Sequence, residues 1–118
     1  MPKDFSRIIR IESLVQETLA KIIQRELKDQ RVGMVTITQV KISRDLSFAK
    51  IYVATHEKDV EKNKITIQAL NHAAKFLRCR LADEIELRKI PELHFYYDEV
   101  WQQGVRISQL LSKETLTE

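Results

Sequence analysis

The amino-acid sequence predicts a two-layer α+β domain in which helices cover one face of a three-stranded sheet. Two stretches, one near the N-terminus and one in the middle of the chain, place apolar residues at steps of three and four, which is the spacing of a buried helical stripe. Three other stretches alternate apolar and polar residues, as half-buried strands do. The predicted order is helix, strand, strand, helix, strand, helix. Because a helical crossover joins the second and third strands, we expect them to be parallel neighbours.

The first helix is predicted over residues 6–28, with Ser6 as its N-terminal cap and Gly33 as the point where the chain reverses. Arg7 and Arg10 lie near its start, where the helix dipole does not favour cations. These two arginines are either solvated or in contact with phosphate, and we treat them as secondary candidates. The apolar residues that form one face are Ile8, Ile11, Val15, Leu19, Ile22 and Leu27.

A strand, a turn and a second strand are predicted next. The apolar residues of segment 34–43 change from one face to the other near Thr38, which indicates a β-bulge. Segment 43–47 has the composition of a turn, in which Asp45 can bond nearby backbone groups, and segment 48–53 is the partner strand. A hairpin is the simplest arrangement of these segments.

The helical stretch over residues 62–82 contains five basic side chains and no Asp or Glu, so we expect its cations to lack partners within the helix. Its apolar stripe consists of Ile67, Leu70, Ala74, Leu77 and Leu81, and a second stripe beside it consists of Lys64, Asn71, Lys75 and Arg78. Phe76 points away from the apolar stripe, so either a second element covers it or the helix breaks near Ala74. A break would create a helix terminus, whose backbone N–H groups can bind phosphate. A solvated face remains the alternative for these cations.

The third strand is predicted to begin at Pro91 and to run to residue 97, and Asp98 is expected to cap a last helix over 99–112. The sheet face turned away from the helices would carry aromatic rings between cations, a combination that stacks bases and holds phosphates. These residues are Phe48, Lys50, Tyr52, His94 and Tyr96. The alternative is that the rings are ordinary strand formers.

Length and composition indicate one domain of 118 residues with its own core. The net charge is only +3, but residues 1–82 carry a net charge of +7 and residues 83–118 one of −4, which suggests a polarised surface for a polyanion. No apolar run approaches a membrane span, and the N-terminus has no secretory pattern, so we expect a cytosolic protein. The single Cys79 excludes an internal disulfide and a multi-cysteine metal site.

Motifs for catalysis are absent from the sequence. It has no Gly-rich phosphate loop, no His-Glu-x-x-His and no nucleophile elbow. Cys79 and His72 would share a helix face, but such a pair is more often packing than a nucleophile and its base. Asp83, Glu84 and Glu86 are more often solvated than bound to a metal. The sequence therefore indicates a binding module, and we expect no enzyme activity, no cofactor and no metal.

An ordered set of short motifs covers almost the whole chain. The motifs are QRELKD (24–29), RVGM (31–34), SRDL (43–46), AKIYV (49–53), IPEL (90–93), Phe95, Asp98 and GVRI (104–107). Their order and content resemble ribosome-binding factor A. The resemblance implies a KH-like fold of the type II arrangement, formed by residues 1–118 as a single RNA-binding domain.

The resemblance also implies a non-enzymatic assembly factor. Such a factor binds the immature 30S small ribosomal subunit and its 16S rRNA in the cytoplasm, assists late maturation and rRNA end processing, and matters most in the cold. A ribosome-associated GTPase would release it, and a monomer is the expected state. The alternatives are a protein–protein adaptor that uses the open sheet face, with RNA contact incidental, and a small hydrolase.

Members of this family carry a helix kink built on Ala-x-Gly in place of the GxxG loop of other KH domains. Ala73, Ala74 and Lys75 align with that kink. Because Lys75 stands where the family has Gly, the sequence leaves open whether the kink forms. If it forms, Lys75 adds a cation where a KH domain meets the RNA backbone. The expected RNA contacts are Arg44, Lys50, Lys64, Asn71, Lys75, Arg78, Arg80, Arg88 and Lys89, with Arg7, Arg10 and Lys41 as a secondary set.

Overall fold

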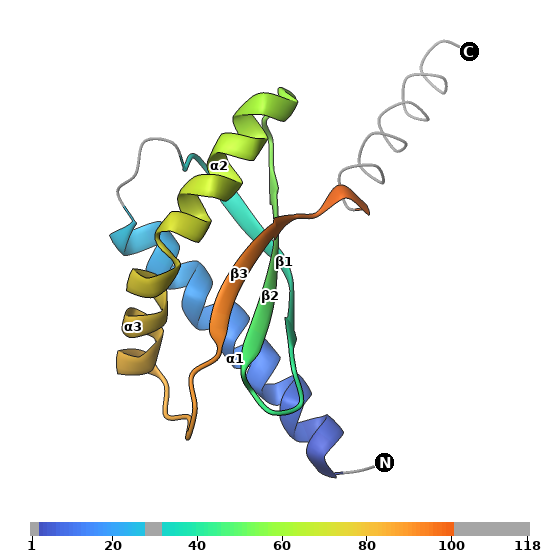
Figure 1. The fold of residues 1–118 in the computed structure, drawn as a ribbon, viewed down its shortest axis with the longest axis vertical. Coiled ribbons are helices and arrows are strands. Elements are labelled where there is room, and N and C mark those ends of the chain that lie inside the picture. The colour runs from blue at the N-terminus through green and yellow to red at the C-terminus, as the bar shows by residue number, and fades with distance from the viewer. Residues whose placement is uncertain (1–2, 28–31, 101–118) are drawn as a thin grey trace, which may run out of the picture.

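The computed structural model describes residues 3–27 and 32–100. In chain order its elements are α1 (Lys3–Glu26), β1 (Val35–Ile42), β2 (Phe48–Thr55), α2 (Val60–His72), α3 (Ala74–Glu84) and β3 (Glu92–Tyr97) (Figure 1). The strand order is β1-β2-β3, with β1 antiparallel to β2 and β2 parallel to β3. The predicted hairpin and the parallel crossover are therefore confirmed. The last helix, predicted over 99–112, lies outside the described residues from position 101 onward.

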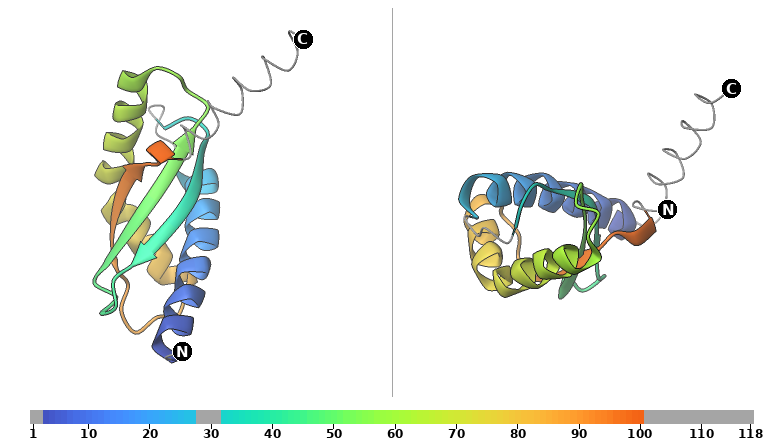
Figure 2. Two further views of the ribbon diagram at one scale, coloured as in Figure 1. Left: turned by 90° about the vertical axis from the view of Figure 1, so that its right-hand side faces the viewer. Right: turned by 90° about the horizontal axis from the view of Figure 1, so that it is seen from above.

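The three described helices pack on one face of the sheet, as predicted (Figure 2). Each strand alternates between the core and the open face, because successive side chains of a strand point in opposite directions. The strand residues that enter the core are Ile37, Val40, Ile42, Ala49, Ile51, Val53, Leu93 and Phe95. The helix residues that meet them are Ile11, Val15, Leu19, Ile22, Ile23, Leu70, Leu77 and Leu81.

Helix α1 is longer at its N-terminal end than predicted. It begins at Lys3, so Ser6 lies inside the helix and is not its cap, and it ends at Glu26. Two polar side chains tie this helix to β1, which is an edge strand. The Glu12 carboxylate accepts the Ile42 N–H at 2.8 Å, and the Gln16 amide donates to the Ile37 carbonyl at 3.0 Å. These contacts satisfy backbone groups of β1 that no neighbouring strand reaches.

The hairpin contains the predicted bulge, because the pairing register shifts between Ile37 and Gln39. The second strand continues two residues beyond the predicted end, to Thr55. Asp98, at the end of β3, accepts a hydrogen bond from the Thr38 hydroxyl at 2.5 Å, so the bulge also anchors the chain as it leaves the sheet.

The turn between β1 and β2 is organised by Asp45, as predicted. Its carboxylate accepts the Ser47 N–H at 3.1 Å and the Ser43 hydroxyl at 2.8 Å. Hydrogen bonding from the Ser47 side chain, followed by the Ser43 hydroxyl and the Ser47 N–H, lowers the pKa of Asp45 from 3.8 to about 2. Leu46 follows with φ of 61°, the left-handed conformation that a non-glycine residue adopts only at a cost. The Asp45 hydrogen bonds hold the chain in this turn.

The lowered pKa predicts how Asp45 affects acid stability. Because the folded-state pKa lies below the unfolded one, the ionised carboxylate stabilises the fold above about pH 4, and this contribution disappears as the pH falls towards about 2. We expect Asp45→Asn to be less stable than the wild type at neutral pH and to lose less stability over that interval. Urea denaturation across the interval measures this. A constant difference between the two proteins would contradict the assignment.

The helical stretch over residues 62–82 is broken into two helices, which is one of the two alternatives that the position of Phe76 left open. Helix α2 begins at Val60, earlier than predicted, because Asp59 caps it by accepting the Glu61 N–H at 2.9 Å. The break falls at Ala73, where φ is −87° and ψ is 1°. Among the described non-glycine residues only Leu46 has positive φ, so this break needs no glycine. This explains why the kink forms with Lys75 in place of Gly.

The break does not bury Phe76, which remains 47% exposed. It does preserve the apolar stripe, since Leu70, Leu77 and Leu81 are fully buried on the two sides of Ala73. It also separates His72 from Cys79, which were expected on one helix face; no hydrogen bond joins them in the described chain.

We expect Lys75→Gly to lower the stability of the fold. Lys75 is helical with negative φ, so glycine relieves no strain there and loses more conformational entropy on folding, at a cost of up to about 1 kcal/mol. Thermal denaturation of the variant beside Gln68→Gly, another exposed helical position, tests this expectation. A higher melting temperature for Lys75→Gly would show that the break is strained.

Candidate nucleic-acid interface

A groove runs between the α2–α3 junction and the free edge of β3, and we call it the junction groove. Its volume is about 620 Å³. It forms because α2 and α3 both pack against β3, which brings residues after the helix break beside the strand edge. The charged and aromatic residues that line it are Lys75, Arg78, Lys89, Glu92, His94, Phe95 and Tyr96. Three cations against one carboxylate make the groove electropositive.

The three cations of the junction groove are held differently. Lys75 is exposed and has no hydrogen bond or ion pair to any other described residue, so its ammonium group is available to a ligand. Arg78 donates from Nε and Nη2 to the Ile90 carbonyl, at 3.2 and 2.8 Å, which leaves the rest of its guanidinium exposed. Lys89 donates to the Ser47 hydroxyl at 3.1 Å. Sequence reasoning missed Ser47, because no local pattern signals a partner 42 residues away.

Asn71 also lines the junction groove, but its amide is engaged with the protein itself. Its Oδ1 accepts the Phe95 N–H at 2.8 Å, and its Nδ2 donates to the Phe95 carbonyl at 3.1 Å. Asn71 was predicted to contact RNA, and the structure instead places its polar atoms on the backbone of β3.

Arg80 lies outside the junction groove, in an ion-pair network between α3 and α1. It contacts Glu26 at 2.8 Å, Asp83 at 2.9 Å and Glu84 at 3.9 Å, and Glu84 also meets Arg25 at 3.3 Å. The hydrogen bond between Arg80 and Glu26 lowers the pKa of the glutamate and raises that of the arginine. Arg80 therefore links the two helices.

The expectation that the cations of residues 62–82 lack partners within their helices is wrong for Arg80 and Lys64. Lys64 pairs with Glu61 at 3.4 Å, and Arg80 pairs with Asp83 one turn along α3. Both carboxylates lie just outside the stretch that has no acidic residue. The error arose because one helical turn crosses the ends of that stretch.

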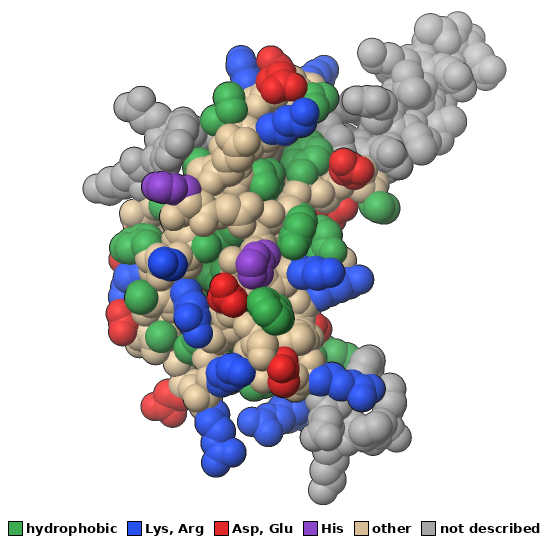
Figure 3. Space-filling model, in the orientation of Figure 1, with side chains coloured by type: hydrophobic (Ala, Val, Ile, Leu, Met, Phe, Trp, Pro, Cys, Tyr) green, Lys and Arg blue, Asp and Glu red, His purple; other side chains and the backbone are tan. Residues whose placement is uncertain are grey.

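Further cations gather at one end of the molecule. The first half of α1, the turn over 43–47 and the loop over 85–91 all lie there (Figure 1). Besides Lys89 of the junction groove, the exposed cations described in these segments are Arg7, Arg10, Arg44 and Arg88. In the same orientation, Figure 3 shows Lys and Arg side chains gathered over the lower half of this face. Lys64 lies in the first half of α2, towards the opposite end.

The open sheet face carries the predicted mixture of aromatic rings and cations. Ring centroids lie 5.7 Å apart for Phe48 and His94, and 5.8 Å apart for Tyr52 and Tyr96. Lys50 is exposed between these pairs, in register with Lys41 on β1. Tyr96 and His94 also line the junction groove, so this face and the groove are continuous around β3.

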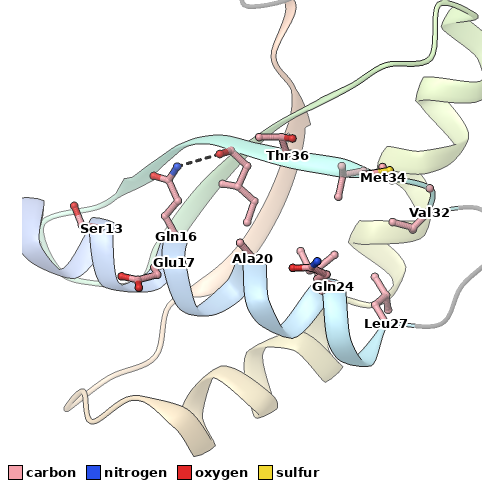
Figure 4. A pocket seen from close by; sticks show the side chains of 13 residues that line it. Ser13, Gln16, Glu17, Ala20, Gln24, Leu27, Val32, Met34 and Thr36 are labelled. Carbon is pink, nitrogen blue, oxygen red and sulfur yellow. Dashed lines mark hydrogen bonds between the residues drawn. The ribbon is translucent and has the colours of Figure 1, made fainter.

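A second groove lies between α1 and the edge of β1, with a volume of about 820 Å³ (Figure 4). Figure 4 shows the Gln16 amide reaching across it to the backbone of Ile37. Among the described residues that line it, Glu17 is the only charged one. Its described lining therefore offers a carboxylate and no cation to a polyanion, so the junction groove is the better candidate.

The described residues form neither a cluster of metal ligands nor a membrane-spanning helix. Across residues 3–27 and 32–100, no three His, Cys, Asp or Glu side chains gather as a metal site requires. None of the helices in those segments combines the length and the apolar character of a membrane span.

Comparison with known proteins gives consistent matches. The family model for ribosome-binding factor A matches residues 7–111. The ribosome-binding factor A of Nitrosospira multiformis is 45% identical over 113 residues, which cover 96% of this chain and 89% of that protein. The crystal structure of ribosome-binding factor A from Thermus thermophilus superposes with a TM-score of 0.66 at 28% identity, over 76% of this chain and 94% of that one.

A further match is a Thermus thermophilus homology model fitted into a cryo-EM map of a 30S–RbfA complex. Its TM-score is 0.62 at 29% identity, over 74% of this chain and 90% of that one. These likenesses confirm the KH-like α+β fold that the sequence motifs implied. By sequence and by fold, this chain belongs to the ribosome-binding factor A family.

Proposed function

We propose that the protein is a non-enzymatic assembly factor that binds the immature small ribosomal subunit through its 16S rRNA in the cytoplasm. In this proposal it assists late maturation and the processing of the rRNA ends. Membership of the family and the Thermus relative fitted into a 30S complex support the partner. The junction groove supports the mode of binding, because it sets three cations beside a free strand edge.

The proposed mechanism uses binding energy alone. Lys75 and Lys89 contact phosphates, and the exposed part of Arg78 adds a third cation at the same groove. The rings of the open face stack on unpaired bases, which single-stranded or irregular RNA offers and a duplex does not. A segment of rRNA held in this way is kept in its immature conformation until the factor leaves. Arg80 and Asn71 take part by holding the walls of the groove, through α1 and β3 respectively.

Salt dependence tests this mechanism. Each phosphate neutralised on a single strand releases counterions, with a slope of about −0.7 in log affinity against log salt, so three contacts predict a slope of about −2. We expect binding to immature subunits, measured by co-sedimentation through sucrose at several potassium concentrations, to follow that slope or a steeper one. Affinity that does not change with salt would contradict the phosphate contacts.

A protein–protein adaptor is the second candidate, because Phe48 and Tyr96 leave 50% and 43% of their surfaces exposed on the open face. Competition distinguishes the two functions. Purified 16S rRNA should displace the protein from immature subunits if RNA is the partner, and should leave it bound if a ribosomal protein is. Intact rRNA after prolonged incubation with the protein would support a role without catalysis.

A further inference from the structure

The free edge of β3 presents backbone hydrogen-bonding groups to the junction groove. In the parallel pairing with β2, the N–H groups of Glu92 and Asp98 donate to Ser47 and Val53. Because these groups alternate in direction along a strand, the N–H and C=O of Phe95 point the other way, towards the groove. An edge of this kind can accept any molecule that brings a donor and an acceptor side by side.

The Asn71 amide occupies this position. The two hydrogen bonds between Asn71 and Phe95, at 2.8 and 3.1 Å, use one donor and one acceptor of a planar carboxamide. The Watson–Crick edge of every RNA base offers such a pair, which is an amino group beside a ring nitrogen in adenine and cytosine and a ring N–H beside a carbonyl oxygen in uracil and guanine. Unpaired bases are commonly recognised through such edges. The amide therefore makes the contacts that a base could make with this part of the strand.

The surroundings place a base and this amide in competition. Asn71 lies in the last turn of α2, two residues before the helix break, and Lys75 and Arg78 follow on α3. All three residues line the same groove as Phe95. A strand of RNA whose phosphates meet those cations passes along the groove, so a base turned towards β3 meets Phe95 where the amide already lies.

We propose that Asn71 takes the place of a nucleobase at Phe95, so that the junction groove holds RNA by its phosphates without reading the base there. This inference rests on the proposed function, since it assumes that RNA enters the groove. It makes Asn71 a residue that limits affinity by excluding a contact with the base. Removal of the amide opens the strand edge, so that a base can add a two-point contact to those of the phosphates.

Binding of single-stranded octamers of adenylate, cytidylate and uridylate, followed by fluorescence anisotropy at low salt, tests the inference. The wild type should bind all three within about threefold, because phosphate contacts carry no sequence information. Asn71→Ala should bind the three octamers about tenfold more tightly than the wild type does, and should bind an abasic octamer no more tightly, because only a base brings the two-point contact. Gln68→Ala, which removes an exposed amide one turn earlier on α2 and disturbs no hydrogen bond to a described residue, should bind like the wild type.

The Phe95 amide resonance in ¹H–¹⁵N spectra locates the effect. Adenylate octamer should shift it in Asn71→Ala and leave it unchanged in the wild type. Asn71→Ser, measured in parallel with thermal denaturation, provides a second variant should the alanine variant fold poorly. Octamer affinities in both variants equal to those of the wild type, or a tenfold gain that the abasic octamer shares, would overturn the inference.

Further outcomes distinguish failure of this inference from failure of the proposed function. If Asn71→Ala forms dimers at rising concentration while its affinities stay equal to those of the wild type, the amide blocks strand addition by protein, and the base-exclusion role is wrong. If no octamer binds either protein, and 16S rRNA fails to displace the wild type from immature subunits, the proposed function fails and the inference fails with it. Displacement by 16S rRNA together with octamer affinities in both variants equal to those of the wild type would overturn the inference alone.

Discussion

Replacement of Lys75 and Lys89 together by glutamate is expected to weaken binding to immature small subunits by about a hundredfold or more. Each lysine is expected to make a charge-assisted contact with phosphate, worth about 1.5–3 kcal/mol, and two such losses exceed a factor of a hundred. The new carboxylates also repel the RNA. Arg78 is left unchanged because its guanidinium holds the Ile90 carbonyl, so its replacement would disturb the fold as well as the binding.

The matched control is Lys21→Glu with Lys58→Glu. Lys21 and Lys58 are exposed and lie outside the junction groove, and the double replacement changes the net charge by the same amount. Co-sedimentation with immature subunits measures binding, and circular dichroism during heating confirms that both variants fold. If the control variant lost as much affinity as the groove variant, the loss would be an effect of net charge and not of the junction groove. Full binding by the groove variant would remove the junction groove from the interface.

Phe95→Ala is expected to destabilise the fold by about 3–5 kcal/mol, which is a large part of the stability of a typical domain. Phe95 is 2% exposed at the centre of β3, and its ring fills the core between the sheet and the helices. Its truncation leaves a cavity that neighbouring side chains only partly fill. The midpoint of urea denaturation, with an unchanged slope, measures the loss.

Tyr96→Ala serves as the matched variant one residue further on. Tyr96 faces the opposite side of the sheet, where its ring centroid lies 5.8 Å from that of Tyr52. We expect its truncation to cost about 1 kcal/mol of stability or less, because 43% of its surface is already exposed. Binding to immature subunits should fall, because the side chain lies where the open face meets the junction groove. A core-sized loss of stability in Tyr96→Ala would show that another part of the chain covers this ring.

Much of the fold followed from local patterns. The periodicity of residues 62–82 identified which leucines enter the core, and the alternation in 34–43 and 48–53 identified the hairpin and its bulge. These predictions succeeded because burial of apolar side chains follows the geometry of helices and strands directly.

The predicted ends of the helices were less accurate. Ser6 resembles a cap but lies within α1, and Asp59 starts α2 before the predicted stretch. Capping depends on backbone geometry, and many Ser and Asp residues do not adopt it.

The helix break shows how a motif can be present without its usual residue. The sequence left the kink open because Lys75 replaces Gly. The structure forms the break at Ala73 with backbone angles that any L residue adopts. The family's glycine is therefore not a steric requirement in this chain. Phe76, which motivated the prediction of a break, stays exposed in the structure.

The sequence by itself determined the order of the elements, the buried stripes, the concentration of cations in residues 62–82 and the family. Only the tertiary structure decided which of those polar side chains remain available. Arg80 pairs with Glu26 across 54 residues and Asn71 bonds the Phe95 backbone across 24, whereas Lys75 forms no hydrogen bond or ion pair with a described residue. The physical reason is that a hydrogen bond or an ion pair needs atoms within a few ångströms of each other. Local sequence carries no record of which distant segments folding brings that close.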